Sequence, residues 1–206
     1  MNDNNILAVI LAGGKSKRFG EDKNLVKLGS LSLIEHVIQK VKEKFKKILI
    51  IANNDLKIEK SSDIVVIPDL IKGNLGPLIG ILTAMKWAKK SNSNYKWIAT
   101  FPSDTPFFDI SIIEKYEKKI IEDDSLLYFV TSSEKRHNIF GLWSIDLLDV
   151  LEEDLLKNNF RKVEDWANKI GVKTINIKFE KFDPFLNINT KEDLSKAEKI
   201  FKDYKK

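Results

Sequence analysis

Short apolar segments alternate with longer amphipathic segments along most of this chain, and this alternation restricts its fold more than any other feature. Residues 6–11 form a continuous apolar run, as expected of a strand that is buried on both faces of a sheet. Further strands are expected at 48–52, 64–67, 97–101 and 126–131, and helices at 33–45, 78–89, 112–121, 146–157 and 163–170. Strands that alternate with helices predict a three-layer α/β fold: a mostly parallel, doubly wound (Rossmann-like) sheet with helices on both faces. We expect one domain over residues 1–206, because a chain of this length fits a single α/β core.

Two more strands and a capped helix are expected in the C-terminal half of the chain. Residues 139–143 are predicted to pair at an edge of the sheet, and residues 174–179 to form the last strand. Thr190 followed three residues later by Asp193 is typical of a helix N-terminus that is capped by side chains. The last helix is therefore expected to begin directly after Thr190.

The composition excludes several classes of chemistry and of partner. The chain has no cysteine, so it has no disulfide, thiolate metal ligand or cysteine nucleophile. Its 35 basic and 30 acidic residues are interleaved, and no basic stripe or aromatic stacking platform indicates nucleic-acid binding. No apolar run approaches the roughly 20 residues that span a bilayer, and residues 1–5 lack the basic start of a secretory signal. We therefore expect a cytoplasmic protein with no nucleic-acid or membrane partner.

A glycine-rich, basic loop follows the first expected strand. Residues 11–23 read Leu-Ala-Gly-Gly-Lys-Ser-Lys-Arg-Phe-Gly-Glu-Asp-Lys. Glycines let backbone amides approach phosphate oxygens, and Arg18 and Lys23 can neutralise the charge of those oxygens. The alternative is a basic surface turn without a ligand. Because folds of this class bind ligands at the carboxyl ends of their strands, we favour a phosphate site.

Two common phosphate loops do not match this segment. A P-loop needs a glycine five residues before the second glycine of its motif, and Val9 occupies that position. The dinucleotide fingerprint fails because no Gly-x-Gly-x-x-Gly pattern follows the strand. The loop therefore belongs to another class of phosphate site.

A single carboxylate lies between two prolines after the fourth strand, in Phe101-Pro102-Ser103-Asp104-Thr105-Pro106. A rigid backbone and a hard oxygen donor at a strand end suit a divalent cation. The alternative is a turn aspartate that accepts hydrogen bonds from its own backbone. Because a phosphate loop is expected at the same edge of the sheet, we favour Asp104 as a ligand of Mg²⁺, which is the cofactor we expect.

These segments resemble the molybdenum cofactor guanylyltransferase family, and the resemblance extends over nearly the whole chain. It is carried by the loop at 11–23, Gly76-Pro77-Leu78, Pro102 to Pro106, Phe140-Gly141-Leu142-Trp143 and Asn187-Ile188-Asn189-Thr190. Gly13 favours the guanylyl branch, because cytidylyl relatives usually have alanine at this position. The resemblance implies an enzyme, a nucleotidyltransferase that transfers GMP from GTP to the terminal phosphate of molybdopterin, giving the guanine dinucleotide cofactor and pyrophosphate.

The resemblance also implies roles for individual residues. The nucleotide-binding residues would be Leu11, Ala12, Gly13, Gly14, Lys23, Asn53, Asp69 and Asp104; the catalytic residues would be Lys23, Arg18 and Asp104; and Asp104 would also be the metal ligand. Ile51 stands where asparagine is frequent in the family, so either Asn53 or a neighbour contacts the base. The phosphate nucleophile needs no protein base near neutral pH, because its second pKa is roughly 6.

The second substrate requires a phosphate site and hydrogen bonds to a pterin. Arg161, Asn187 and Asn189 are the candidates, because arginine suits phosphate and an asparagine amide offers both a donor and an acceptor. The alternative is that both asparagines make turn and capping bonds before the last helix. The implied partners are GTP and molybdopterin, and further the cofactor-delivery proteins and recipient molybdoenzymes.

Other functions remain open from the sequence. A cytidylyltransferase or a sugar-phosphate nucleotidyltransferase would use a similar first loop, although Gly13 and residues 187–190 favour the guanylyl enzyme. A non-catalytic GTP-binding adaptor in cofactor delivery would keep the loop for binding alone. Asp104 favours catalysis, because a silent binder has less need of a metal carboxylate.

Overall fold

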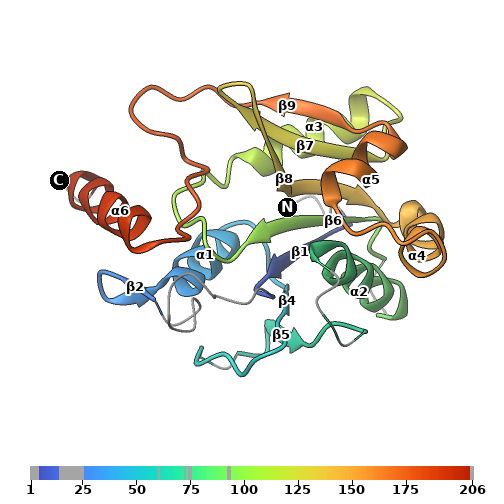
Figure 1. Cartoon of the computed structure of the whole chain (residues 1–206), viewed down its shortest axis with the longest axis horizontal. Coiled ribbons are helices and arrows are strands. Elements are labelled where there is room, and N and C mark those ends of the chain that lie inside the picture. Colours follow the sequence, from blue (N-terminus) through green and yellow to red (C-terminus); the bar gives the residue numbers. More distant parts are fainter. Residues whose placement is uncertain are drawn as a thin grey trace.

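A seven-stranded sheet organises the part of the chain that the computed structural model describes, which is residues 5–13, 26–59, 61–71, 73, 76–91 and 94–204. The strands are β1 Ile6–Leu11, β4 Ile48–Ile51, β5 Ile64–Ile67, β6 Trp97–Pro102, β7 Leu127–Ser132, β8 Lys135–Ser144 and β9 Lys173–Asn176. Their order across the sheet is β5-β4-β1-β6-β8-β7-β9 (Figure 1). Every neighbouring pair is parallel except the two that involve β8. The mostly parallel sheet that the sequence predicts is therefore confirmed.

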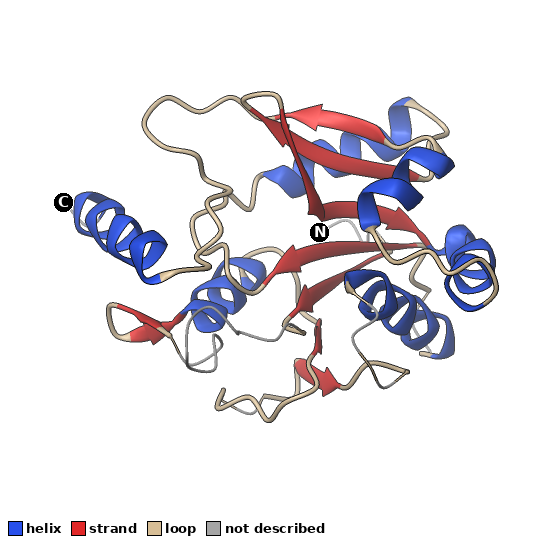
Figure 2. Ribbon diagram, viewed as in Figure 1, coloured by secondary structure: helices blue, strands red, loops and turns tan. Residues whose placement is uncertain are grey.

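Helices cover both faces of this sheet (Figure 2). They are α1 Leu33–Lys42, α2 Pro77–Lys90, α3 Ile112–Glu122, α4 Leu148–Leu156 and α5 Val163–Ile170, with α6 Lys191–Tyr204 beside the sheet. In β1, Ile6, Ala8 and Ile10 pack in one core with α1 and α3, whereas Leu7 and Val9 pack in the other core with α2, α4 and α5. Successive strand residues point to opposite faces, so a strand between two helical layers is apolar throughout. None of the described helices is both long and apolar enough to cross a membrane.

Strand β8 lies inside the sheet, so the expectation of an edge strand at residues 139–143 is wrong. β8 is hydrogen-bonded to β6 on one side and to β7 on the other, antiparallel to both. Gly141 makes room in this interior position, because a Cβ there would lie 2.8 Å from Phe129 Cε1. The polar start of the strand, Lys135 to Asn138, hides its length in the sequence pattern. The edge on this side is β9, which ends at Asn176 and not at residue 179.

A small two-stranded hairpin, β2 (Lys27–Leu28) and β3 (Leu31–Ser32), packs against α6 beyond the carboxyl ends of β1 and β6 (Figure 1). The sequence pattern does not predict it, because two residues are too few to show a strand period. Gly29 has φ +69° and lies against the Phe201 ring of α6. The hairpin thus packs the described residues that begin at Val26 against the C-terminal helix.

The predicted cap of α6 is confirmed. The backbone N–H of Asp193 donates to Thr190 Oγ1 at 3.1 Å, and the N–H of Thr190 donates to Asp193 Oδ2 at 2.9 Å. Each side chain satisfies the backbone of the other residue, which is the reciprocal arrangement of a capping box. The segment before α6 is therefore held at a defined place.

Candidate active site

Four strand ends meet at one edge of the sheet, because β5, β4, β1 and β6 are parallel neighbours. Backbone bonds extend this pairing past the strands: Ala12 N donates to Ile51 O at 2.9 Å, Ala52 N to Ile67 O at 3.0 Å and Ser103 N to Leu11 O at 3.2 Å. The predicted site residues Gly13, Asn53, Asp69 and Asp104 follow these four ends directly. They are therefore arranged along a single edge, as the strand-end argument predicts.

Asn53 and Asp69 form a reciprocal pair at this edge. Asn53 Nδ2 donates to Asp69 Oδ2 at 2.6 Å, and the backbone N–H of Asp69 donates to Asn53 Oδ1 at 3.0 Å. Gly13 lies against the pair: a Cβ on this residue would be 3.7 Å from Asp69 Oδ2 and 3.8 Å from Asn53 Nδ2. The structure thus brings three of the predicted nucleotide-binding residues together around one carboxylate.

Helix α2 packs beneath this carboxylate, through residues that sequence reasoning missed. At Gly80 a Cβ would lie 3.1 Å from Leu11 Cδ2 and 3.4 Å from Asp69 Oδ1, so only a small residue lets the helix approach. One turn further on, Thr83 Oγ1 accepts a bond from the backbone N–H of Leu70 at 2.9 Å. These contacts fix the segment that carries Asp69. The sequence signal is a glycine inside an otherwise helical pattern.

The side chain of Ile51 belongs to the same packing. Ile51 is buried, and its Cγ2 would lie 3.5 Å from a Cβ on Gly80. Asn53, in contrast, is exposed at the edge of the sheet. Of Ile51 and Asn53, only Asn53 therefore offers a polar side chain at the candidate site.

Asp104 lies at the end of β6, and the structure places Asn187 beside it. Thr105 Oγ1 is 3.1 Å from Asp104 Oδ1 and 3.2 Å from Asn187 Oδ1. The backbone N–H of Ile188 also donates to the carbonyl of Asp104 at 3.0 Å. A predicted metal ligand and a predicted second-substrate residue, far apart in the sequence, therefore share one hydroxyl group.

The donor set around Asp104 fits Mg²⁺. Within the described ranges, no three side chains of histidine, aspartate and glutamate gather into a complete metal site. Mg²⁺ rarely uses such an all-protein site, because it keeps several waters and is usually held by one or two carboxylates together with substrate phosphates. Asp104 offers one partly exposed carboxylate, which suits an ion held in this way, and Mg²⁺ stays a prediction.

Arg161 is held by the turn between α4 and α5. Its Nη1 donates to the carbonyls of Leu155 at 2.8 Å and Phe160 at 2.7 Å, and its Nη2 donates to Asn159 Oδ1 at 2.9 Å. Its own carbonyl lies at the start of α2, 2.9 Å from a Cβ on Gly76. The guanidinium of Arg161 thus closes a turn beside α2, whereas Asn187 lies beside Asp104.

Asn189 belongs to the start of α6. Its backbone N–H donates to Asp193 Oδ2 at 3.0 Å, next to the capping box. The roles of Arg161, Asn187 and Asn189 in binding a second substrate stay predictions.

Gly14, Arg18 and Lys23 lie outside the described residues, so their roles also stay predictions. Val26 is the first described residue after them, and it is buried in a small core that also contains Phe107 and Ile188. Val26, the segment after Asp104 and the segment that contains Asn187 are therefore packed together.

Comparisons with known proteins show the family of this chain. Residues 8–170 match the family described as MobA-like NTP transferase domain. The molybdenum cofactor guanylyltransferase of Rhizobium rhizogenes is 33% identical over 195 residues, which cover 92% of this chain and 89% of that protein. The protein of the same name from Haemophilus influenzae is 35% identical over 194 residues, covering 93% and 97%. The chain belongs to the molybdenum cofactor guanylyltransferase family.

The fold of this family extends over nearly the whole chain. The crystal structure of molybdopterin-guanine dinucleotide biosynthesis protein A from Archaeoglobus fulgidus matches with a TM-score of 0.72 at 23% identity, covering 95% of this chain and 98% of that protein. The family match at residues 8–170 contains Gly13, Asn53, Asp69 and Asp104 but ends before Asn187. The resemblance inferred from the sequence motifs is confirmed.

Serine, histidine and aspartate side chains form a cluster at β7, β8 and the segment after β9, and their order does not suit catalysis. Ser132 Oγ lies 2.6 Å from His137 Nε2 and 3.2 Å from Asp183 Oδ1. Ser132 is fully buried and stands between the other two side chains, whereas a nucleophilic triad needs the histidine in the middle. Burial lowers the pKa of His137, partly offset by the charge of Asp183. The cluster ties the segment after β9 to strands β7 and β8.

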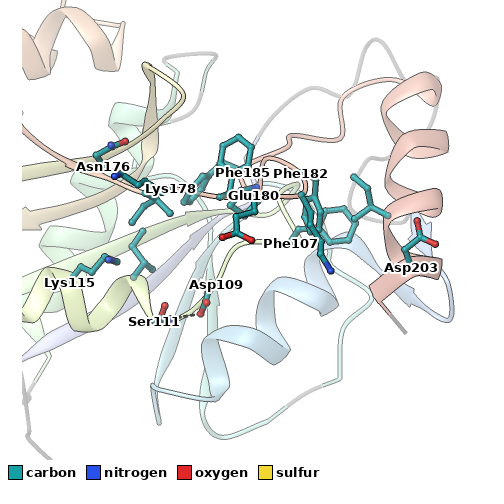
Figure 3. A pocket seen from close by; sticks show the side chains of 16 residues that line it. Phe107, Asp109, Ser111, Lys115, Asn176, Lys178, Glu180, Phe182, Phe185 and Asp203 are labelled. Atoms are coloured by element: carbon teal, nitrogen blue, oxygen red, sulfur yellow. Dashed lines mark hydrogen bonds between the residues drawn. The ribbon is translucent and has the colours of Figure 1, made fainter. Parts of the chain in front are cut away.

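A groove of about 1100 Å³ opens beside the candidate site, between α3, α6 and the segment after β9 (Figure 3). Phe107, Phe182 and Phe185 line it together with charged side chains such as Lys115 and Glu180. Its lining contains none of the predicted site residues. It borders the site through Phe107, which follows the Asp104 loop.

Proposed function

We propose that this chain transfers GMP from GTP to the terminal phosphate of molybdopterin, giving the guanine dinucleotide cofactor and pyrophosphate. The family supports the class of reaction, because both relatives described above carry the name molybdenum cofactor guanylyltransferase. The observation that carries the choice of base is the Asn53–Asp69 pair beside Gly13.

The pair suits guanine because of its hydrogen-bonding pattern. Guanine presents two adjacent donors, N1–H and the N2 amine, and a carboxylate is an acceptor-only group. Cytosine presents an acceptor at N3 beside its N4 amine, so a carboxylate matches only half of that edge. Asn53 already donates to Asp69 Oδ2, which keeps the carboxylate in one orientation toward the base. Gly13 leaves the space that a purine needs.

The phosphates would lie between this pair and Asp104. An oxygen of the molybdopterin phosphate forms a bond to the α-phosphorus of GTP while the bond from that phosphorus to the α,β-bridging oxygen breaks, and pyrophosphate leaves with the electron pair. The backbone of residues 11–14, Arg18 and Lys23 would bind and align the triphosphate. Asp104 would hold Mg²⁺, which offsets the negative charge of the two phosphate groups when it is bound.

The second substrate would approach from the side of Asn187, because this amide lies beside Asp104 through Thr105. Asn189 and Arg161 are proposed as further contacts, the first by its neighbourhood to Asn187 and the second by its planar, phosphate-binding group. Delivery proteins, recipient molybdoenzymes and a cytoplasmic location stay predictions from the sequence.

Turnover with different nucleotides tests the proposal. The purified chain is supplied with Mg²⁺ and molybdopterin, and pyrophosphate release and dinucleotide formation are measured with GTP, CTP and ATP. We expect both products with GTP, and both only when molybdopterin is present. A preference for CTP would identify a cytidylyl enzyme. Binding of GTP without pyrophosphate release would identify a non-catalytic adaptor.

A further inference from the structure

We propose that Thr105 is a positioning residue: it fixes the carboxylate of Asp104 and couples it to Asn187 on the second-substrate side. The proposal rests on the function proposed above, in which Asp104 holds the metal ion and Asn187 faces molybdopterin. That scheme gives Thr105 no role. From the sequence, its position between Asp104 and Pro106 is that of a turn residue.

The hydrogen-bonding capacity of one hydroxyl group defines the arrangement. Thr105 is fully buried, and its Oγ1 lies within donating distance of two acceptors, Asp104 Oδ1 at 3.1 Å and Asn187 Oδ1 at 3.2 Å. A hydroxyl has only one proton to donate. The two acceptors therefore compete for this proton, and a bond to Asn187 is made at the expense of the bond to Asp104. Thr105 thus links the second-substrate side to the metal ligand through one shared proton.

The segment that carries Asn187 is held firmly on both sides of this contact. The backbone N–H of Ile188 donates to the carbonyl of Asp104 at 3.0 Å, and the side chain of Ile188 is fully buried. Upstream, Asp183 Oδ1 accepts from Ser132 Oγ at 3.2 Å, and downstream Thr190 begins the capping box of α6. Asn187 therefore has little freedom to leave Thr105 unless a ligand competes for its amide.

The coupling follows from this competition. A carboxylate that accepts a hydrogen bond from a fixed donor is restricted to one rotamer, and a metal ligand held in one rotamer loses less freedom on binding the ion. When a second substrate engages Asn187, it changes the partner of the Thr105 hydroxyl and hence the restraint on Asp104. Thr105 would thereby relate metal binding to the occupancy of the molybdopterin side.

The test measures Mn²⁺ binding to the protein–GTP complex by electron paramagnetic resonance, alongside kcat and KM for GTP. Thr105→Val keeps the shape of the side chain but removes the hydroxyl, and Thr105→Ser keeps the hydroxyl. We expect Thr105→Val to weaken Mn²⁺ binding roughly three- to tenfold, which corresponds to the loss of one hydrogen bond. It should lower kcat with little change in KM for GTP, and Thr105→Ser should restore both Mn²⁺ affinity and kcat.

Asn187→Ala and the double variant Thr105→Val/Asn187→Ala test the coupling itself. Asn187 acts on Asp104 only through the Thr105 hydroxyl, so the double variant should bind Mn²⁺ as Thr105→Val alone does. Asn187 is exposed, so its replacement gives a decisive result even if Thr105→Val fails to fold. Thr100→Val is the matched control, because Thr100 is a fully buried threonine of β6, five residues before Thr105, whose hydroxyl donates to the Ile139 carbonyl at 2.6 Å. It should lower stability and leave Mn²⁺ affinity unchanged.

Two results would overturn the proposal: wild-type Mn²⁺ affinity in both Thr105→Val and Asn187→Ala, or effects of the two substitutions that add in the double variant. A loss of Mn²⁺ affinity in Thr100→Val equal to that in Thr105→Val would also overturn it, because general destabilisation would then explain the effect. Failure of the proposed function has a different signature, namely a wild-type protein that makes no guanine dinucleotide from GTP and molybdopterin. Mn²⁺ binding to the GTP complex distinguishes the two, since it does not depend on turnover.

Discussion

Replacing Asp69 by asparagine should abolish the preference for the N2 amine of guanine while the fold is retained. The new side chain has the same shape, and its amide oxygen can still accept the bond that Asn53 Nδ2 makes to Asp69 Oδ2 at 2.6 Å. The tight contact with α2 at Gly80 is also unchanged in volume. The amide nitrogen, however, presents hydrogens toward the guanine donors, so an attraction becomes a mismatch.

The size of the effect follows from the chemistry of one bond. A hydrogen bond to a charged group contributes about 1.5–3 kcal/mol, or roughly 10- to 150-fold in affinity. Asp69 is only partly buried, so water weakens the interaction and the lower end applies. Inosine triphosphate has N1–H but lacks the N2 amine. Wild-type protein should therefore bind GTP about tenfold more tightly than inosine triphosphate, and the Asp69→Asn variant should bind GTP no more tightly than inosine triphosphate.

Calorimetric titration of both nucleotides in EDTA measures this ratio without a contribution from a metal ion at Asp104. Asp63→Asn is the matched control, because Asp63 is an exposed carboxylate directly before β5. It should leave the ratio of the two affinities at the wild-type value. Thermal unfolding of each variant confirms that the fold is intact.

An unchanged ratio in Asp69→Asn would refute the reasoning, because the carboxylate would then not contact the N2 amine. An equal change in Asp63→Asn would also refute it, since the effect would then reflect the overall charge of the protein and not a specific contact.

Three further predictions follow from the same structure. Asp104→Asn should reduce turnover at least about a hundredfold with an unchanged unfolding midpoint, because the amide keeps the shape but loses the charge that holds Mg²⁺; a normal rate at ordinary Mg²⁺ would contradict the metal assignment. Gly13→Ala should fold normally, since its Cβ would lie at ordinary distances of 3.7 and 3.8 Å from its neighbours, yet it should weaken binding of GTP more than of CTP in the same titration. Asp154→Ala should lower the free energy of unfolding by about 1–3 kcal/mol at pH 7, because the buried Trp166 Nε1 loses its acceptor. Burial alone would raise the pKa of Asp154, but hydrogen bonds from Lys169 and its other donors lower it. The stability that Asp154 contributes is therefore present above the unfolded pKa of about 3.9 and is lost as the pH falls through the lower pKa of the folded state. Urea unfolding at pH 7 and pH 3 should show that the difference in unfolding free energy between wild type and variant shrinks at the lower pH.

The sequence predicts the sheet well where strands are buried on both faces. β1 is apolar from Ile6 to Leu11 because it packs against a helical layer on each side, and such a run has few other interpretations. β8 is equally central, but Lys135 to Asn138 are polar and Gly141 interrupts the apolar pattern. Its position depends on packing that the glycine permits, and this packing is set by Phe129 on another strand.

The sequence likewise predicts some residues of the candidate site and not others. Asn53, Asp69 and Asp104 could be predicted because each directly follows a strand, and parallel strands end at one edge. Gly80 could not, because its role is the close approach of α2 to Leu11 and Asp69, which only the packed structure defines. Thr105 could not either, because its hydroxyl contacts a residue 82 positions further along the chain. Contacts of that kind have no signature in a single sequence.

Transfer of labelled phosphorus tests the central claim most directly. The chain is incubated with Mg²⁺, molybdopterin and GTP that is labelled with ³²P either at the α-phosphorus or at the γ-phosphorus. Guanylyl transfer predicts that the α label appears in a pterin dinucleotide and the γ label in pyrophosphate, each only when molybdopterin is present. Release of the γ label as inorganic phosphate, or an α label that stays in GTP while the nucleotide binds, would contradict the claim.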